Sequence, residues 1–509
     1  MAEELISENA GKTSGHLTKS LLAVAFLSSF GSSMLYGYNL AVVNSPAQYI
    51  KAFYNETLFE RHDRTPDDHL LTVLYSVTVS IFAIGGMTGA LLVGRLVTKY
   101  GRKGTLVRST MLVFVGGALM GFSRWFRNPA MVITGRFITG VHSGTSALFL
   151  RVMTPPIQLR SFRCFGNFPG LRMCQLDIKS ERLLFLTQEE HWPLLLALVV
   201  FPTAVQLMLL PWFPESPRYL LIEKGNIHAT IAALKWFRSK GDIQAEIEEM
   251  QEEQRSLSSI QTLSVGRLLM DSCVRWQVIT IVVVNIGMQL SGIDAIWFYT
   301  NDIFRNAGIP EPHIQYTTVG TGAIEVIAGM LGCFTIERVG RRPLIIGGFL
   351  FMGICCAGIT VSVLHQAQIP FMSYISVGCV IGIIAGFCIG PAGVPFLITA
   401  ELFKQSHRPS AYTVAGCLNW LSNFTIGFVF PFLQEATGPY CYLIFCAICF
   451  GVAIYAIFII PETKNKTFLE ISQMFASRNK IPSEELASNG HLKMALMNGY
   501  GTLGIHEEK

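Results

Sequence analysis

Long apolar segments alternate with short polar ones along most of the chain. The apolar segments are about 20 residues long, the length that a helix needs to cross a hydrocarbon core of roughly 30 Å. They lie at residues 21–43, 69–94, 105–122, 129–150 and 192–213, and again at 277–300, 316–336, 343–365, 372–398, 411–433 and 441–460. The pattern predicts an all-α polytopic membrane protein.

The polar stretches divide this pattern into parts. We expect a cytosolic N-terminal tail, an N-terminal helix bundle, a cytosolic linker of short amphipathic helices, a C-terminal helix bundle, and a cytosolic tail that is partly disordered. Their boundaries are 1–18, 19–213, 214–272, 273–460 and 461–509. Residues 1–18 carry no cleavable signal pattern, so the first apolar segment is expected to target the chain to the membrane.

Composition narrows the class of protein. Hydrophobic residues make up 51% of the 509 residues and charged residues 14%, whereas soluble domains carry roughly a quarter charged residues. The net charge of +5 comes from short basic clusters, which is unlike a nucleic-acid-binding face. The 12 cysteines lack a metal-ligand spacing, and there is no phosphate-binding loop motif. We therefore expect no cofactor, no metal site and no enzymatic activity.

Two short motifs occur twice. Gly101-Arg102-Lys103 matches Gly340-Arg341-Arg342, and Pro214 to Arg218 matches Pro461 to Lys464. Both pairs are offset by about 240 residues, which indicates two homologous halves, the parallel-repeat design of many secondary transporters.

The basic residues indicate the orientation in the membrane. Lys and Arg in short loops stay on the cytosolic side, so both Gly-Arg loops and both termini are expected there. The loop at residues 44–68 then faces outward, and Asn55 in Asn55-Glu56-Thr57 becomes a predicted glycosylation site. The triplet at Asn423 lies within a span and is expected to stay unmodified.

Taken together, the motifs resemble the sugar-porter family of the major facilitator superfamily, and more narrowly its vertebrate facilitative hexose and urate transporters. The resemblance covers most of residues 19–475. It rests on both Gly-Arg loops, Gly135-Arg136, Pro214 to Arg218, Gln289-Leu290-Ser291-Gly292, Glu337 to Arg342, Gly390-Pro391, Glu401 to Arg408, Trp420 with Asn423-Phe424, and Pro461 to Lys464. It implies the major facilitator fold, with two six-helix bundles.

Several positions bear on the branch of the family. Ala295 to Asn301, and Glu325, are similar to the urate-transporting member, whereas glucose-type members usually carry Asn at the position of Glu325. Cys388 replaces a Glu of many glucose carriers, and Asn419 stands where the fructose carrier has His. Urate and hexose therefore stay alternative substrates.

The chain departs from the family at residues 151–191, where a fifth membrane span is expected. Charged residues interrupt this interval, and each would cost roughly 2.5–3.5 kcal/mol at mid-bilayer. Without a fifth span the linker would fall outside the cell, so our hypothesis is a local exon replacement or reading-frame error. Smaller departures are Thr98 for Asp, Met288 for Gln, and Asp294 for Asn.

Candidate substrate-binding residues are polar or aromatic and lie within the predicted spans. A solute must exchange water hydrogen bonds for protein ones in a polar, aromatic-walled site. The candidates are Gln289, Asp294, Tyr299, Glu325, Asn419 and Trp420. Intramembrane carboxylates such as Asp294 and Glu325 are usually functional or paired. The alternatives are interhelical hydrogen bonding for Gln289, a structural role for Glu325 and core packing for Trp420.

Candidate gating residues form two groups. Pro391 and Pro395 interrupt the tenth span beside several glycines, and Ser291-Gly292 permits bending in the seventh. Charged residues near span ends can form contacts that differ between two states; they are Arg102, Arg136, Glu215, Arg218, Glu337, Arg341, Glu401, Arg408 and Glu462. The alternative is that they only hold loops inside the cell.

These observations favour a uniporter that moves a hexose (glucose or fructose) or urate across the plasma membrane by alternating access. Its predicted partners are a small-molecule solute and the lipid bilayer. The first span lacks the carboxylate of proton-coupled sugar porters, which favours uniport. A proton-coupled symporter and a transport-incompetent isoform that associates with a membrane partner remain alternatives.

Overall fold

The computed structural model describes residues 34–63, 66–153, 190–237, 243–244, 246–248, 250–251, 264–369, 371–403, 406–464, 466 and 468–479. Every element in these ranges is a helix. Within them, 7 stretches are long and apolar enough to cross a membrane. Two of these stretches, Asp68–Phe122 and Arg408–Ile459, each hold two of the predicted spans. The predicted all-α fold is confirmed.

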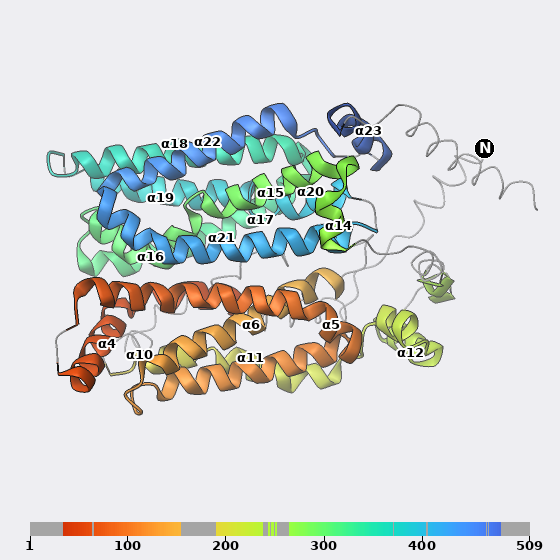
Figure 1. Ribbon diagram of the computed structural model, residues 1–509, viewed down its shortest axis with the longest axis horizontal. Helices are drawn as coiled ribbons and strands as arrows, with labels where there is room; N and C mark the ends of the chain where they lie inside the picture. The colour runs from red at the N-terminus through yellow and green to blue at the C-terminus, as the bar shows by residue number, and fades with distance from the viewer. Residues whose placement is uncertain are drawn as a thin grey trace, which may run out of the picture.

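The helices form two layers (Figure 1). The N-terminal half contains α3 (Met34–Ala41), α5 (Asp68–Phe122), α6 (Pro129–Met153), α10 (Trp192–Ala197), α11 (Val200–Leu209) and η3 (Leu210–Trp212). The C-terminal half contains α15 (Arg275–Leu290), α16 (Ile293–Asn306), α17 (Glu311–Val339), α18 (Arg341–His365), α19 (Met372–Ile389), α20 (Val394–Leu402), α21 (Arg408–Thr437), η6 (Gly438–Tyr440) and α22 (Cys441–Ile459). The two halves meet mainly where α5 lies along α21.

Glycines allow α5 and α6 to approach backbone to backbone. A Cβ atom on Gly85 would stand 2.1 Å from the Phe137 carbonyl oxygen, and one on Gly144 would stand 1.9 Å from that of Gly86. Small residues are the usual means of packing helices in lipid, where burial of apolar surface gives no advantage. This close packing holds one face of α5 rigidly and leaves the other face to α21.

Two spans of the C-terminal half are broken near their middle. Gly292 has φ 94° between α15 and α16, a left-handed conformation that suits glycine. The second break lies between α19 and α20 at residues 390–393, where Pro391 cannot continue the helical hydrogen bonds. Both breaks occur where the sequence predicts bending, and the first lies between Gln289 and Asp294.

Shorter helices mark the two ends of the bundle (Figure 1). At one end lies α4 (Ala47–His62), in an interval where a loop was expected, and Asn55 is exposed on it. At the opposite end lie η4 (Tyr219–Glu223), α12 (Ile227–Phe237), α14 (Val265–Met270), η5 (Ser272–Val274) and α23 (Phe468–Asn479). The linker has its own small core of Leu221, Leu234, Ile247 and Met250.

Helix α23 was not expected from the polar C-terminal sequence. Ile471 and Phe475, one turn apart, are buried, and Arg478 donates to the carbonyl groups of Phe458 (2.6 Å) and Ile459 (2.8 Å). The tail predicted to be disordered, from residue 480 onward, lies outside the described residues. So does most of the atypical interval, residues 154–189.

Candidate functional site

A chain of three polar side chains lies at the break between α15 and α16. In the amide orientation that satisfies its neighbours, Gln289 donates from Nε2 to Asp294 at 2.9 Å, and its Oε1 accepts from Asn419 Nδ2 at 2.6 Å; such orientations are assigned from the hydrogen-bond network. Gln289 belongs to α15, Asp294 to α16 and Asn419 to α21, so three helices contribute. The structure thus brings together three of the predicted substrate-binding residues.

The same carboxyl group has a further buried polar neighbour. Asn423, one turn beyond Asn419 on α21, lies beside Asp294, and both side chains are fully buried. Asn423 was not among the predicted substrate-binding residues, although it belongs to a glycosylation triplet and to one of the motifs that carry the family resemblance. Its spacing of four residues from Asn419, which places both on one helix face, is the signal that would have identified it.

An aromatic wall crosses the boundary between the two halves. The ring of Trp420 in α21 lies 5.7 Å from that of Tyr36 in α3 and 6.0 Å from that of Phe82 in α5, both edge-to-face. Gly86 lies beneath the indole, since a Cβ atom there would stand 2.4 Å from it. Trp420 therefore packs against the opposite half.

Glu325, on α17, lies near the aromatic residues Tyr36 and Trp420. Its side chain is buried, with 2% exposed, and Tyr36 lies within electrostatic reach of both Glu325 and Asp294. Two buried carboxyl groups, amide groups and an indole therefore surround one part of the boundary. Such a set can bind hydroxyl groups through its oxygen atoms and a flat apolar face through the indole.

Tyr299 lies elsewhere than the other predicted binding residues. Its hydroxyl donates to the Gly427 carbonyl oxygen at 2.6 Å, and its ring lies 6.2 Å from that of Tyr75 in the opposite half. Nearby, the backbone N–H of Asn301 donates to Asn44 Oδ1 at 3.2 Å. These contacts join the two halves toward the α4 end, and the sequence did not predict the pair of asparagines.

At the other end of the N-terminal half, Glu215 binds the start of a helical segment. Its carboxylate accepts from the backbone N–H groups of Arg102 (3.1 Å) and Lys103 (3.0 Å), just after Gly101 with φ 77°. A carboxylate is favourable there because the first N–H groups of a helix have no intrahelical partner. Arg102 also donates to Ser216 Oγ at 2.8 Å.

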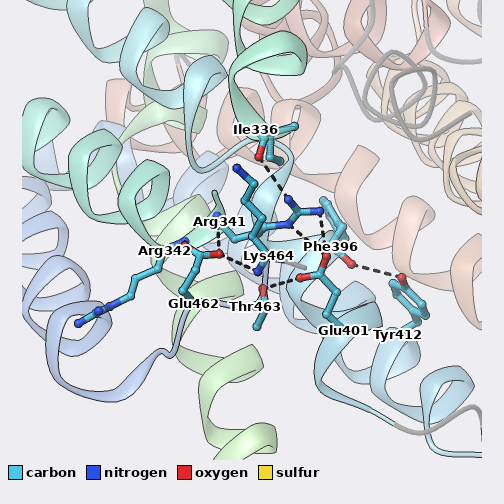
Figure 2. Close-up of polar contacts among 9 residues, drawn as sticks. All are labelled: Ile336, Arg341, Arg342, Phe396, Glu401, Tyr412, Glu462, Thr463 and Lys464. Carbon is cyan, nitrogen blue, oxygen red and sulfur yellow. Dashed lines mark hydrogen bonds and ion pairs between the residues drawn. The ribbon is translucent and has the colours of Figure 1, made fainter. Parts of the chain in front are cut away.

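The C-terminal half repeats this arrangement (Figure 2). Glu462 accepts from the backbone N–H groups of Arg341 and Arg342, each at 3.1 Å, beside Gly340 with φ 105°. Arg341 also forms an ion pair with Glu401 at 3.1 Å, and Thr463 donates to Glu401 at 2.5 Å. The repeated motifs therefore form equivalent caps in both halves.

The remaining gating candidates occupy varied positions. Arg408 donates to the Phe403 carbonyl oxygen at 2.9 Å, and Arg218 is the last residue of the Pro214 to Arg218 motif. Pro391 and Pro395 flank the break between α19 and α20, and the side chain of Glu337 lies outside the described residues. The Arg341–Glu401 ion pair and the Arg408 hydrogen bond lie within the C-terminal half, so contacts of the charged candidates that differ between two states stay a prediction.

Arg136 differs from the other charged candidates in being fully buried near the α4 end. It donates to the carbonyl oxygens of Asn39 (2.6 Å) and Thr78 (3.3 Å) and lies over the Phe82 ring. The loop that precedes its helix contacts α4 through Arg127 and Glu60 at 2.5 Å. Arg136 therefore connects three helices of the N-terminal half, far from the Glu215 cap.

Comparisons with known proteins agree with this architecture. The family model described as "Sugar (and other) transporter" matches residues 24–475. Human solute carrier family 2, facilitated glucose transporter member 9, is 45% identical over 472 residues, covering 92% of this chain and 87% of that protein. Human facilitated glucose transporter member 5 is 41% identical over 475 residues, covering 92% and 94%.

A similar fold occurs in a solved structure. The proton:xylose symporter XylE bound to 6-bromo-6-deoxy-D-glucose aligns with a TM-score of 0.73 at 20% identity, covering 90% of this chain and 100% of that one. At this identity the match concerns the fold, which is that of the major facilitator superfamily.

Proposed function

Because the chain belongs to the sugar-transporter family of the major facilitator superfamily, we propose that it is a facilitative carrier that moves a hexose down its gradient by alternating access. The observation that supports this most directly is the polar and aromatic cluster at the boundary between the halves. Trp420 offers a flat face beside the Gln289, Asp294 and Asn419 chain. The names of the relatives, facilitated glucose transporters, point to the same class of solute.

Alternating access requires contacts that differ between two states. Toward the α4 end the halves are joined through Asn44 with Asn301 and Tyr75 with Tyr299. These contacts would have to separate before a solute could enter from that side. The predicted mechanism is a rocking of one half against the other. This motion exposes Trp420 and its neighbours first to one side of the membrane and then to the other.

The orientation forms part of the proposal. We place the α4 end outside the cell, where Asn55 could be glycosylated, and the end with α12, α14 and α23 in the cytosol. The basic loops at Arg102 and Arg341 lie at this second end, as the positive-inside tendency requires. The proposal is thus a multi-pass protein of the plasma membrane with both termini in the cytosol.

Uptake into oocytes tests the proposal. We expect saturable uptake of labelled fructose or glucose that stops when the inner and outer concentrations are equal. Trp420→Ala should abolish it at unchanged surface abundance, whereas Trp212→Ala, whose side chain is 80% exposed, should not. Uptake no greater than in uninjected oocytes, at normal surface abundance, would refute carrier activity of this chain.

Two further measurements distinguish the carrier from a proton-coupled symporter and from a transport-incompetent isoform. A proton-coupled symporter would make the medium more alkaline when hexose is added. A transport-incompetent isoform would take up hexose only after residues 151–191 were replaced by a family-like fifth span. Labelled urate is measured beside the hexoses, because the sequence leaves urate as an alternative substrate.

A further inference from the structure

The turn at Gly101 within α5 is more basic than the equivalent turn of the C-terminal half. Residues 95–108 contain no acidic residue and five basic ones: Arg95, Lys99, Arg102, Lys103 and Arg108. The equivalent residues 334–347 contain three arginines and Glu337. When the two Gly-Arg motifs are aligned, Thr98 stands in the position of Glu337. The N-terminal copy therefore lacks the acidic group that partly neutralises the C-terminal copy.

Two of the five basic residues are engaged within the protein. Lys103 Nζ donates to the carbonyl oxygens of Pro211 (3.0 Å) and Phe213 (2.8 Å). Arg102 donates to Ser216 Oγ at 2.8 Å. The remaining three are exposed: Arg95, Lys99 and Arg108. None of these three forms an ion pair with a carboxylate in the described part of the chain.

The exposed cations gather around the ring of Tyr100. Lys99 Nζ lies 5.2 Å from the centre of this ring, and the guanidinium carbon of Arg108 lies 3.9 Å from it. Arg108 also donates to the Gly104 carbonyl oxygen at 3.0 Å, which fixes the direction of its side chain. Arg95 lies one helical turn before Lys99 on the same face. Positive charges from both arms of α5 thus lie close together without a counter-charge, and such an arrangement attracts an anion.

Apolar side chains border these cations on both arms of α5. Leu91 precedes Arg95 by one turn, and Met111 follows Arg108 by three residues. The exposed apolar residues here are Leu91, Leu92, Met111, Leu112 and Val115. They belong to a stretch that is long and apolar enough to cross a membrane, so they face lipid. Lys and Arg side chains at such a border extend their charged groups to the level of the lipid headgroups.

We propose that Arg95, Lys99 and Arg108 form a binding site for the phosphate-bearing headgroup of an anionic phospholipid in the cytosolic leaflet. This inference goes beyond solute transport and rests on the orientation that is part of the proposed function. The cytosolic leaflet carries anionic lipids, and each Lys or Arg near its surface adds to the attraction. Arg108 keeps N–H donors for a phosphate besides the one that binds Gly104, and Lys99 adds a point charge.

The C-terminal half offers an internal comparison for this site. Arg338 stands in the position of Lys99 and is also exposed, but Glu337 precedes it. Phe334 and Gly347 replace the two exposed arginines. The second copy therefore presents fewer cations at the same level of the membrane, and we expect it to bind anionic lipid weakly.

Native mass spectrometry of the purified full-length protein tests the site. The protein is mixed with equal amounts of phosphatidylserine and phosphatidylcholine that carry the same acyl chains, and the fraction that binds each lipid is measured. We expect phosphatidylserine to be preferred. Lys99→Gln and Arg108→Gln should each weaken its binding about fivefold. Thr98→Glu, which introduces the acidic residue of the second copy, should also weaken it, and binding of phosphatidylcholine should stay unchanged in all three variants.

Arg338→Gln is the matched control, because it removes an exposed cation at the equivalent position of the other half. It should leave the binding of phosphatidylserine unchanged. The inference is overturned if the double variant Lys99→Gln and Arg108→Gln binds phosphatidylserine as tightly as the unmodified protein, or if Arg338→Gln weakens binding equally. Displacement of the lipid by an equal concentration of glycerol 3-phosphate would indicate a site for soluble phosphate compounds and would also overturn it.

The lipid site and the carrier function fail separately. Preference for phosphatidylserine that is lost in the double variant, together with no hexose uptake into oocytes, would refute the carrier and leave the lipid site standing. Hexose uptake by a protein that binds both lipids equally would support the carrier and overturn the site. Labelling of Lys99 from outside the cell would overturn the assignment to the cytosolic leaflet, and the inference with it.

Discussion

Gly86 and Trp420 are in direct contact across the boundary between the two halves. A Cβ atom on Gly86 would stand 2.4 Å from Cζ3 of the indole, a separation that real side chains do not adopt. Trp420 also contacts Tyr36 and Phe82 of the N-terminal half. A residue larger than glycine at position 86 must therefore displace the indole, and with it the proposed flat face of the solute site.

Gly86→Ala is expected to reduce hexose uptake at least several-fold at unchanged surface abundance. The control is Gly94→Ala on the same helix, where no atom lies within 4 Å of the added Cβ. Uptake and surface biotinylation are measured for both variants in the same cells. Equal uptake by the two would show that the contact between Gly86 and Trp420 has no role in transport.

The cap at the start of α18 should be sensitive to glycine replacement. Gly340 has φ 105°, and a Cβ atom there would stand 2.7 Å from Glu462 Oε2. Strained backbone of this kind costs about 1–3 kcal/mol. Gly340→Ala is therefore expected to lower the melting temperature of the purified protein, whereas Gly347→Ala, with open space around it, should not. Indistinguishable melting curves would contradict this account of the cap.

Local pattern was enough to predict nine of the eleven spans and the repetition of the two motifs, but not the caps that these motifs form. Each predicted span is identified by the length of its apolar segment. Glu215 and Glu462 have equivalent environments because they belong to two copies of one motif. The break at Gly292 was also predictable, because a Ser-Gly pair within a helix permits bending. These features depend on neighbouring residues in the sequence.

Pairings between distant elements could not be predicted in the same way. Asn44 and Asn301 are 257 positions apart and meet only because the two halves pack together. The position of Tyr36 against Trp420 has the same origin. The hydrogen bond from the Tyr299 hydroxyl to the Gly427 carbonyl oxygen likewise joins residues 128 positions apart, and a solute-binding role for Tyr299 stays a prediction. Helix α23 was missed because its buried side is only a few residues long.

Glycosylation offers a test of orientation that does not depend on transport. Asn55 is exposed on α4, whereas Asn423, in a second such triplet, is fully buried within α21. Asn55→Gln is expected to abolish the mobility shift that peptide-N-glycosidase F produces on a gel. Asn423→Gln should leave that shift unchanged. A shift that persists in Asn55→Gln, or none in the unmodified protein, would argue against an external α4 end.

Glu325 provides the last prediction, which concerns both affinity and proton coupling. Loss of a hydrogen bond to a charged group costs about 1.5–3 kcal/mol, so Glu325→Gln should raise the KM for hexose by roughly 10- to 150-fold if the carboxylate accepts from the solute. Glu311→Gln, on the same helix but with a side chain 65% exposed, should not.

Proton coupling is tested with the same variant. A uniporter predicts no alkalinisation of the medium when hexose is added, either for the unmodified protein or for Glu325→Gln. Alkalinisation by the unmodified protein that disappears in Glu325→Gln would instead establish symport, with Glu325 as the group that carries the proton. An unchanged KM and an unchanged pH profile would remove Glu325 from the mechanism and leave Asp294 as the carboxylate next to the solute.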